Sequence, residues 1–493
     1  MNARALALIL LLPLDLVLTA RDSMGQTPAT APTRRLTDRL TPCRVPDLEE
    51  KVLCGRHEVF ENRATGAGRK IGLNIVVLPA KSPQAAPDPL VFLAGGGVAP
   101  ATGYARFLAG AFADLRKERD ILLIDQRGTG GSNPLRCDLP TEAANPEYRD
   151  EGRFLENVRN CRKELKRKAD PRYYTTPVAM DDLDEVRGWL GYPRLNLYGA
   201  SYGTKAAMVY VRQHLDTVRS VVLQGVMPID APVWLEVPRS SQQALEHVFA
   251  VCAVQKDCHD AFPDLAQEFN ALLDRLAGKP VRFKVSRPEG GQEVEVPIDA
   301  EILRVFVLRM LYSADRIHDL PLLIHLAHAG DYQPLARRLA IPPDSGIPKG
   351  IYFTIVCSDE IPQFDPAALP AAAAGSFLGD FRIGRELLAC GKWTRGWLPE
   401  GYRTPVGSNV PALVMNGALD HITPPRYGER VAKSLTNARS LVLPNRGHND
   451  VDPCVTGIIQ SFVAAGGPNG LDTSCLAKTP DLSFATRADE LMD

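Results

Sequence analysis

Gly199-Ala200-Ser201-Tyr202-Gly203 decides the fold, because here a serine lies between two glycines directly after an apolar run. The preceding residues, 195–198, predict a short buried strand, and residues 204–214 (TKAAMVYVRQH) predict a helix. Glycines on both sides permit the sharp strand-to-helix turn that exposes a serine side chain at the end of a sheet. Ser201 is therefore the candidate nucleophile.

Apolar runs elsewhere in the chain predict a mostly parallel β-sheet. The runs are spaced widely enough for helices between them, which is typical of α/β folds. They cover residues 71–78, 90–93, 121–124, 195–198 and 218–223, and late in the chain residues 412–415 and 440–443. The predicted fold class is α/β, with a mostly parallel sheet flanked by helices.

The stretch 227–405 has a different pattern and predicts an inserted, mainly helical cap. Within it we expect helices at residues 241–253 and 266–276, a β-prone stretch at 280–296, and an Ala- and Pro-rich surface connection at 366–375. Ligands of open α/β sheets bind beyond the carboxyl ends of the strands. An insertion after the strand that ends near Leu223 would therefore cover Ser201 and select its substrates.

A serine hydroxyl is a weak nucleophile at neutral pH, so Ser201 needs a base and a carboxylate that orients the base. Where an α/β sheet presents a serine in this way, the acid and then the histidine follow later in the chain. Asp420 follows the predicted strand 412–415, and His448 follows the predicted strand 440–443. We predict a triad of Ser201, Asp420 and His448, with His448 as the base.

Other residues compete for these roles. Of the nine histidines, only His448 follows both a predicted strand and a glycine after the acid, and His421 is expected to point away. Asp450 and Asp452 are alternative acids, but they follow the histidine and break the chain order. Thr423 would either cap the following helix or hydrogen-bond near the triad, and capping is the favoured interpretation.

Acyl transfer needs hydrogen-bond donors for the negative oxygen that develops on the substrate. The backbone N–H of Tyr202, directly after the serine, is the first predicted donor. The second is expected in the glycine run Gly95-Gly96-Gly97 after residues 90–93, where bare backbone can approach a substrate closely. We assign it to Gly96, with Gly95 and Gly97 as alternatives. No Gly-Lys-Ser/Thr follows, which excludes a phosphate-binding P-loop.

The composition of the 493-residue chain is that of a soluble globular protein, with 45% hydrophobic and 23% charged residues and a net charge of −1. Its length fits one elaborated domain or two. The basic residues are dispersed, so we expect no nucleic-acid partner. No Cys/His cluster has the spacing of zinc ligands, and the predicted chemistry requires neither a metal nor an organic cofactor.

The N-terminus resembles a secretory signal peptide, with Arg4 followed by the apolar stretch 5–14. This stretch is too short to span a membrane, so no membrane span is expected after signal removal. Asp15 interrupts the apolar region, and residues 18–20 (LTA) are an imperfect cleavage site, so a buried N-terminal helix is the alternative. The pattern predicts a secreted or periplasmic protein.

The ten cysteines support export. An even number of cysteines is typical of a disulfide-bonded protein, and disulfides persist in the oxidising compartments that exported proteins reach. Sequence alone leaves other connectivities open, but sequential neighbours suggest five local pairs. The predicted pairs are Cys43 with Cys54, Cys137 with Cys161, Cys252 with Cys258, Cys357 with Cys390, and Cys454 with Cys475.

Several segments together resemble the α/β-hydrolase peptidases related to proline iminopeptidase, and more closely the secreted tripeptidyl-aminopeptidase-like branch. The segments, which span Cys43 to Cys475, are residues 125–132 (DQRGTGGS), 199–204 (GASYGT), 420–425 (DHITPP) and 447–448 (GH), with Cys357-Ser358-Asp359, Cys390-Gly391-Lys392-Trp393 and the tail cysteines Cys454 and Cys475. The family's GGPG segment appears here as residues 95–98 (GGGV), a departure at the predicted oxyanion loop.

This resemblance implies an α/β-hydrolase fold and a secreted serine peptidase that removes residues from free peptide N-termini. A carboxylic-ester hydrolase acting on small acyl substrates, or a catalytically silent binding protein, are the alternatives on the same fold. An aminopeptidase needs cap carboxylates for the substrate ammonium, because a buried cation without a partner is costly. Glu236, Asp359 and Glu360 are the candidates, with a structural contact as the alternative for each.

The expected organisation has four parts. Residues 1–25 are the signal peptide and leader, and residues 40–226 are the first part of the α/β-hydrolase core. Residues 227–405 are the cap insertion. Residues 406–480 are the second part of the core, which holds the tripeptidyl-aminopeptidase-like (TAP-like) C-terminal region.

Overall fold

The structure, a computed structural model, describes residues 36–96, 99–137, 139–140, 145–286, 293–341 and 348–492. The predicted signal peptide and leader lie outside these residues. All elements discussed below belong to one unit, Leu36–Asp493. No helix of the described ranges is long and apolar enough to cross a membrane.

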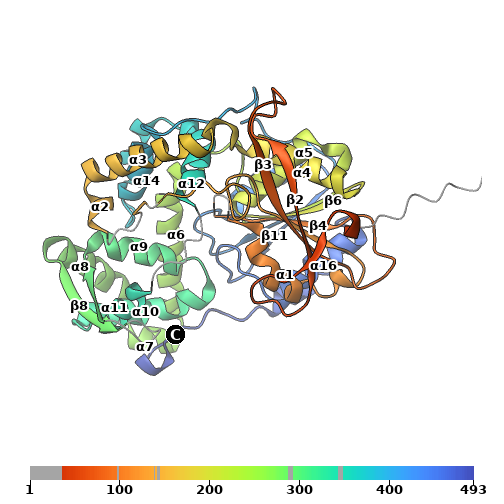
Figure 1. Cartoon of the computed structure of the whole chain (residues 1–493). Helices are drawn as coiled ribbons and strands as arrows, with labels where there is room; N and C mark the ends of the chain where they lie inside the picture. The colour runs from red at the N-terminus through yellow and green to blue at the C-terminus, as the bar shows by residue number, and fades with distance from the viewer. Residues whose placement is uncertain are drawn as a thin grey trace, which may run out of the picture. The chain divides into compact units, whose positions relative to one another are not determined.

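A twisted sheet with parallel strands at its centre organises the described residues (Figure 1). Its strands are β1 (Thr41–Cys43), β2 (Val52–Phe60), β3 (Lys70–Leu78), β4 (Leu90–Leu93), β5 (Ile121–Ile124), β6 (Leu195–Ala200), β7 (Val218–Gln224), β10 (Ala412–Gly417) and β11 (Ala438–Leu443). The spatial order is β1-β2-β3-β5-β4-β6-β7-β10-β11. From β5 to β11 all neighbours are parallel, whereas β1, β2 and β3 pair antiparallel at one edge.

Each apolar run that predicted a strand lies within a strand of this sheet. The predictions missed β1 and β2. β1 is three residues long and contains a proline, while β2 (VLCGRHEVF) includes a glycine and three charged or polar residues. Both strands lie at the antiparallel edge, where burial is incomplete and no continuous apolar run is needed.

The central strands β4 and β5 are apolar throughout because helices cover both faces of the sheet. In β4 the side chains of Val91 and Leu93 join one hydrophobic core, and those of Leu90 and Phe92 join the other. The first core includes α4 (Thr176–Leu190) and α5 (Tyr202–Gln213). The second includes α1 (Ala105–Ala111) and α16 (Pro453–Ala465). This layered arrangement fixes the carboxyl ends of β6, β10 and β11 at one edge.

The chain between β7 and β10 is mainly helical. Residues 237–340 build a separate hydrophobic core, whereas buried residues between 351 and 402 join the core of the sheet that contains α4 and α5. In Figure 1 the helices α6 to α11 form a group apart from the sheet. The elements are α6 (Val233–Val254), α7 (Lys256–Ala261), α8 (Leu265–Gly278), the hairpin β8 (Val281–Ser286) and β9 (Glu293–Ile298), α9 (Ala300–Met310), α10 (Ala314–Ala329), α11 (Gln333–Ala340), α12 (Lys349–Ile355), α13 (Leu369–Ala373) and α14 (Phe381–Cys390). We propose residues 227–405 as the cap.

One prediction within this stretch is incomplete, because the segment 366–375 lies largely at the surface but is also helical. Residues 366–375 are not simply a surface connection, because they contain the 3-10 helix Pro366–Ala368 and the helix α13. Leu369 and Ala373 are one helical turn apart and both are buried, so packing rather than exposure determines this segment.

The structure pairs all ten cysteines into the same five disulfides that sequential neighbours suggested. Each closes a loop of no more than 33 residues. The Cys357–Cys390 bond is the one that matters for the site, because it ties a π-helical turn, Val356–Glu360, to α14.

Candidate active site

Ser201 occupies a strained turn between β6 and α5. Its backbone has φ 55° and ψ −122°, a region that non-glycine residues rarely adopt. A Cβ on Gly199 would lie 2.3 Å from the carbonyl oxygen of Gly203, and one on Gly203 would lie 1.9 Å from that of Leu93. Both glycines are therefore required for the turn that places Ser201 at the carboxyl end of the sheet.

The structure brings Ser201, His448 and Asp420 together in one hydrogen-bonded row. The Oγ atom of Ser201 lies 2.9 Å from Nε2 of His448, and Nδ1 of His448 lies 2.9 Å from Oδ2 of Asp420. Asp420 follows β10 and His448 follows β11, so the parallel strands deliver both to the edge at which β6 ends. In this geometry the imidazole can accept the serine proton while the carboxylate orients it.

Asp420 is buried, yet its surroundings favour the charged form. Backbone N–H groups of Ile422 and Thr423 donate to Oδ1 at 2.9 and 2.7 Å, and the Thr423 hydroxyl donates to Oδ2 at 2.6 Å. Burial raises the pKa of Asp420, but the charge of His448 and these hydrogen bonds lower it by more, so the pKa lies below its usual value. Asp420 therefore stays ionised beside the imidazole.

Thr423 bonds to the triad and does not cap the following helix. Pro424 occupies the N-cap of α15 (Pro425–Ala432), and no side chain caps that helix. The Thr423 hydroxyl instead donates to Asp420 and lies 3.1 Å from Nδ1 of His448. The favoured capping interpretation was wrong because the two prolines move the helix start one residue further along the chain.

Replacing Thr423 with valine is expected to slow the reaction of Ser201 with a fluorophosphonate by about tenfold, because a buried carboxylate loses one donor. The second-order labelling rate constant measures this activation without any choice of substrate. Thr456→Val is the matched control, since the Thr456 hydroxyl bonds only to backbone carbonyls. Equal rates for Thr423→Val and the wild type would show that Thr423 does not support the triad.

The competing acids and histidines have other tasks. Asp450 accepts backbone N–H groups of Gly447 and Ala314, and Asp452 caps α16 and pairs with Arg446. His421 packs edge-on against Tyr312, with ring centroids 4.7 Å apart. Burial lowers the pKa of His421 to about 3, so it remains neutral and cannot replace His448 as the base.

The predicted oxyanion donors adjoin the turn. Tyr202 is the first residue of α5, and N–H groups of a first helical turn have no partner within the helix. Gly96 has φ +68°, and a Cβ on Gly95 would lie 2.9 Å from both the Ala200 carbonyl oxygen and the Ser201 Cβ. This loop therefore runs against the nucleophile turn, while residues 97 and 98 lie outside the described ranges.

Of the three predicted cap carboxylates, Glu236 is already paired. Its Oε2 accepts from Arg426 at 3.0 Å and from the Tyr427 hydroxyl at 2.8 Å. Asp359 and Glu360 lie in the π-helical turn and are buried. Asp359 Oδ1 and Glu360 Oε2 have no hydrogen-bond partner among the described residues, so each carboxylate keeps one oxygen available.

The structure adds partners of these acids that the sequence did not reveal. Lys205, buried in α5, forms an ion pair with Glu360. The Thr176 hydroxyl donates to Asp359 Oδ2 at 2.7 Å, and the Tyr202 hydroxyl lies 2.8 Å from the Thr176 oxygen. The side chain of the predicted oxyanion residue is thus bonded, through Thr176, to the acidic turn.

Asp359 predicts a pH dependence of stability. Burial and the neighbouring Glu360 raise its pKa to about 6 from an ordinary 3.8, although Lys205 opposes the shift. Between these values the folded state binds more protons than the unfolded state, so stability should fall as pH rises towards 6. Relative to Asp359→Asn, the wild type should lose about 2.4 kcal/mol of unfolding free energy from this group between pH 4 and pH 7.

Urea unfolding of both proteins across this range measures the difference. Asp216→Asn, at an exposed position, is the control and should track the wild type. A constant difference between the wild type and Asp359→Asn would contradict the raised pKa.

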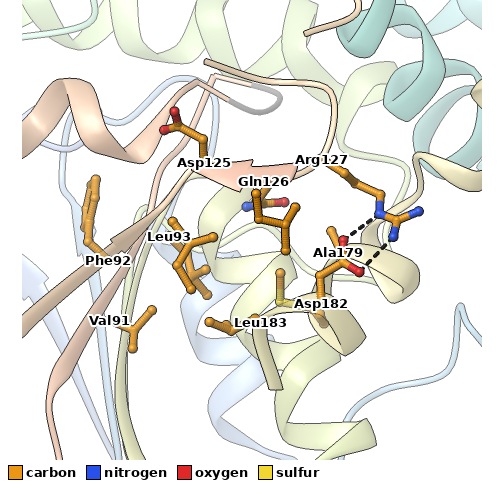
Figure 2. Close-up of a pocket in the computed structure, with 12 residues that line it drawn as sticks. Val91, Phe92, Leu93, Asp125, Gln126, Arg127, Ala179, Asp182 and Leu183 are labelled. Carbon is orange, nitrogen blue, oxygen red and sulfur yellow. Dashed lines mark hydrogen bonds and ion pairs between the residues drawn. The ribbon is translucent and has the colours of Figure 1, made fainter. Parts of the chain in front are cut away.

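Residues 125–132 have a structural task next to the site. Figure 2 shows Arg127 paired with Asp182, with Nε and Nη2 donating at 2.6 and 2.7 Å. Arg127 Nη1 also donates to the carbonyl oxygens of Glu61 and Tyr173, both at 2.8 Å. The adjoining cavity has a volume of about 10 Å³ and holds no more than one water molecule, so it is not a peptide site.

Comparisons with known proteins agree with this architecture. A family profile described as "alpha/beta hydrolase fold" matches residues 88–261, and one described as "TAP-like protein" matches residues 376–475. Among solved structures, a proline iminopeptidase of Mycobacterium smegmatis is similar, with 17% identity, a TM-score of 0.40, and coverage of 84% of this chain and 98% of that chain.

Two relatives are peptidases by name. The chain is 23% identical over 405 residues to a tripeptidyl aminopeptidase of Streptomyces coelicolor, which covers 74% of this chain and 71% of the relative. It is 25% identical over 475 residues to the serine protease Hip1 of Mycobacterium tuberculosis, which covers 86% of this chain and 88% of the relative. The predicted fold and resemblance are confirmed: the chain has the α/β-hydrolase fold, is similar to the TAP-like peptidases and is a serine hydrolase.

Proposed function

We propose that the chain is a secreted aminopeptidase in which Ser201, His448 and Asp420 form the catalytic triad. The observation that carries this proposal is the hydrogen-bonded row from Ser201 Oγ through His448 to Asp420. An aspartate that stays ionised and a serine in a strained, exposed turn are what acyl transfer requires.

In the proposed reaction, Ser201 Oγ attacks the carbonyl carbon of the scissile peptide bond while its proton moves to His448 Nε2. The negative oxygen that develops is held by the N–H groups of Tyr202 and Gly96. The C–N bond then breaks, and the amine leaves with the proton from His448. Water, deprotonated by the same nitrogen, hydrolyses the acyl-enzyme and restores Ser201.

The free N-terminus of the substrate would bind at Asp359 and Glu360. Lys205 offsets one of these two charges, so the cluster keeps a net charge of −1 when both carboxylates are ionised. Each carboxylate also has one oxygen without a partner among the described residues. An ammonium group offers the charge and the donors that these oxygens lack.

Secretion is supported by the signal-like N-terminal sequence and by the five disulfides, which persist in oxidising compartments. N-terminal sequencing of the protein recovered from the periplasm or the medium tests this point. An intact Met1 in a cytoplasmic fraction would contradict it.

Substrate class is tested with arylamides of one, two and three residues, each with a free or an acetylated N-terminus, alongside short acyl esters. We expect arylamide hydrolysis that requires the free N-terminus, and the name of the Streptomyces relative makes the three-residue member the first choice. Turnover of the esters alone would favour a carboxylic-ester hydrolase. Cleavage of acetylated and free peptides at equal rates would exclude the aminopeptidase.

A further inference from the structure

Arg382, in the first turn of α14, has donors that the protein itself does not use. Its guanidinium lies over the ring of Trp234, 5.7 Å from the ring centroid. Within the described ranges it forms no hydrogen bond and no ion pair, although it is only partly exposed. Guanidinium groups in such places normally bind a carboxylate or a carbonyl oxygen.

Tyr312 places this cation close to the triad. The Tyr312 ring packs edge-on against His448, with centroids 5.5 Å apart, and its carbonyl oxygen accepts the backbone N–H of His448 at 2.8 Å. The charge of Arg382 acts on Tyr312 and also on His421, which follows Asp420. Arg382 therefore belongs to the part of the cap that lies beside the catalytic histidine.

Charged and aromatic groups surround Arg382. Lys349 lies over the ring of Tyr352, 5.4 Å from its centroid, and its charge reaches Glu386. Glu386 is the one carboxylate of this group, and the Tyr352 hydroxyl donates to its Oε1 at 2.8 Å. Burial raises the pKa of Glu386, which reduces the negative charge that this carboxylate sets against Arg382.

The start of α14 adds a partial positive charge next to Arg382. The helix has ten residues, and no side chain caps its first turn. The N–H groups of a first turn carry a partial positive charge, and helical side chains lean towards this end of the helix. Figure 1 shows α14 beside α12 and α3, which agrees with their contacts. The guanidinium of Arg382 and a helix start without a side-chain cap thus favour an anion at the same place.

We propose that Arg382 forms a subsite for a carboxylate of the peptide substrate. The inference rests on the proposed function and deepens it, because a peptide would be held by its ammonium at Asp359 and Glu360 and by a carboxylate at Arg382. The guanidinium packs against the ring of Trp234, and its fork of N–H groups can bind one carboxylate through two hydrogen bonds. The carboxylate is either an acidic side chain or the C-terminus of a short peptide.

Paired substrates test the subsite and separate these two sources. The first series is tripeptide arylamides with Glu or Gln at each position in turn, and the second is short peptides with a C-terminal carboxylate or amide. For one series, we expect the wild type to favour the carboxylate member by about 10- to 100-fold in kcat/KM. Arg382→Gln should abolish this preference and leave the neutral member within about twofold.

Two further variants make the result specific. Arg382→Lys keeps the charge but not the fork of donors, so it should retain part of the preference. Arg337→Gln removes an exposed arginine elsewhere on the cap and should behave as the wild type. Thermal unfolding of each variant shows whether the fold is intact.

The subsite is overturned if the wild type discriminates within neither series, or if Arg382→Gln lowers both members of a pair equally. Failure of the proposed function gives a different result, because the wild type would then cleave none of the peptides. If Arg382→Gln loses the preference for the carboxylate member only in the side-chain series, the ligand is an acidic side chain. If it loses that preference only in the C-terminal series, the ligand is the C-terminal carboxylate.

Discussion

Replacing Ser201 with alanine is expected to lower kcat for a peptide arylamide by about 10⁴- to 10⁶-fold, because the nucleophile is removed from a unit whose members act together. His448→Ala should cost a similar factor, and the double variant should be no worse than either single variant. Steady-state rates at saturating substrate measure all three. Labelling by a fluorophosphonate should disappear in Ser201→Ala.

The matched control is Ser434→Ala, because the Ser434 hydroxyl bonds only to the backbone carbonyl of Val431 and to no residue of the proposed triad. Its rate and labelling should equal those of the wild type. Undiminished labelling of Ser201→Ala would place the reactive serine elsewhere and refute the triad.

Replacing Arg127 with methionine is expected to reduce the free energy of unfolding by about 3–5 kcal/mol, because Asp182 loses its bidentate partner in a buried position. Three backbone carbonyls, those of Phe60, Glu61 and Tyr173, lose a donor at the same time. The midpoint and slope of urea unfolding measure the change. Figure 2 shows the two bonds between Arg127 and Asp182, which a methionine cannot make.

A double variant separates lost charge from lost packing. Arg127→Met with Asp182→Leu removes both charges and should recover part of the stability, since the cost of an unpaired carboxylate is gone. Arg63→Met is the milder control, because Arg63 also pairs with Asp182 but is partly exposed. If Arg127→Met destabilises no more than Arg63→Met, the buried pair is not a principal support of the fold.

The parallel strands and the three residues of the row could be predicted because their signals are local. β4 and β5 are short, wholly buried apolar runs, and Ser201, Asp420 and His448 each come shortly after the end of a predicted strand. The carboxyl ends of parallel strands meet at one edge, so position along the sequence also gives position in space.

Residues that depend on distant partners could not be predicted in this way. Lys205 is a lysine in an amphipathic helix, a residue type that is normally exposed, and its burial requires Glu360, which lies 155 residues further along the chain. The burial of Asp182 could not be predicted either, because it depends on Arg127, which lies 55 residues earlier in the chain. For Thr423 the local signal was misleading, because a helix cap and a triad bond both need a hydroxyl at that point.

Tyr202 also limits how this enzyme can change over evolutionary time. Its amide is the proposed oxyanion donor, and its hydroxyl is bonded through Thr176 to the acidic turn proposed to receive the substrate N-terminus. Substitutions in that turn which admit new peptides would also disturb the donor that speeds the reaction. A substitution that changes specificity at this turn would therefore also change the rate. We expect homologues with new substrates to retain the acidic turn and to differ in the rest of the cap.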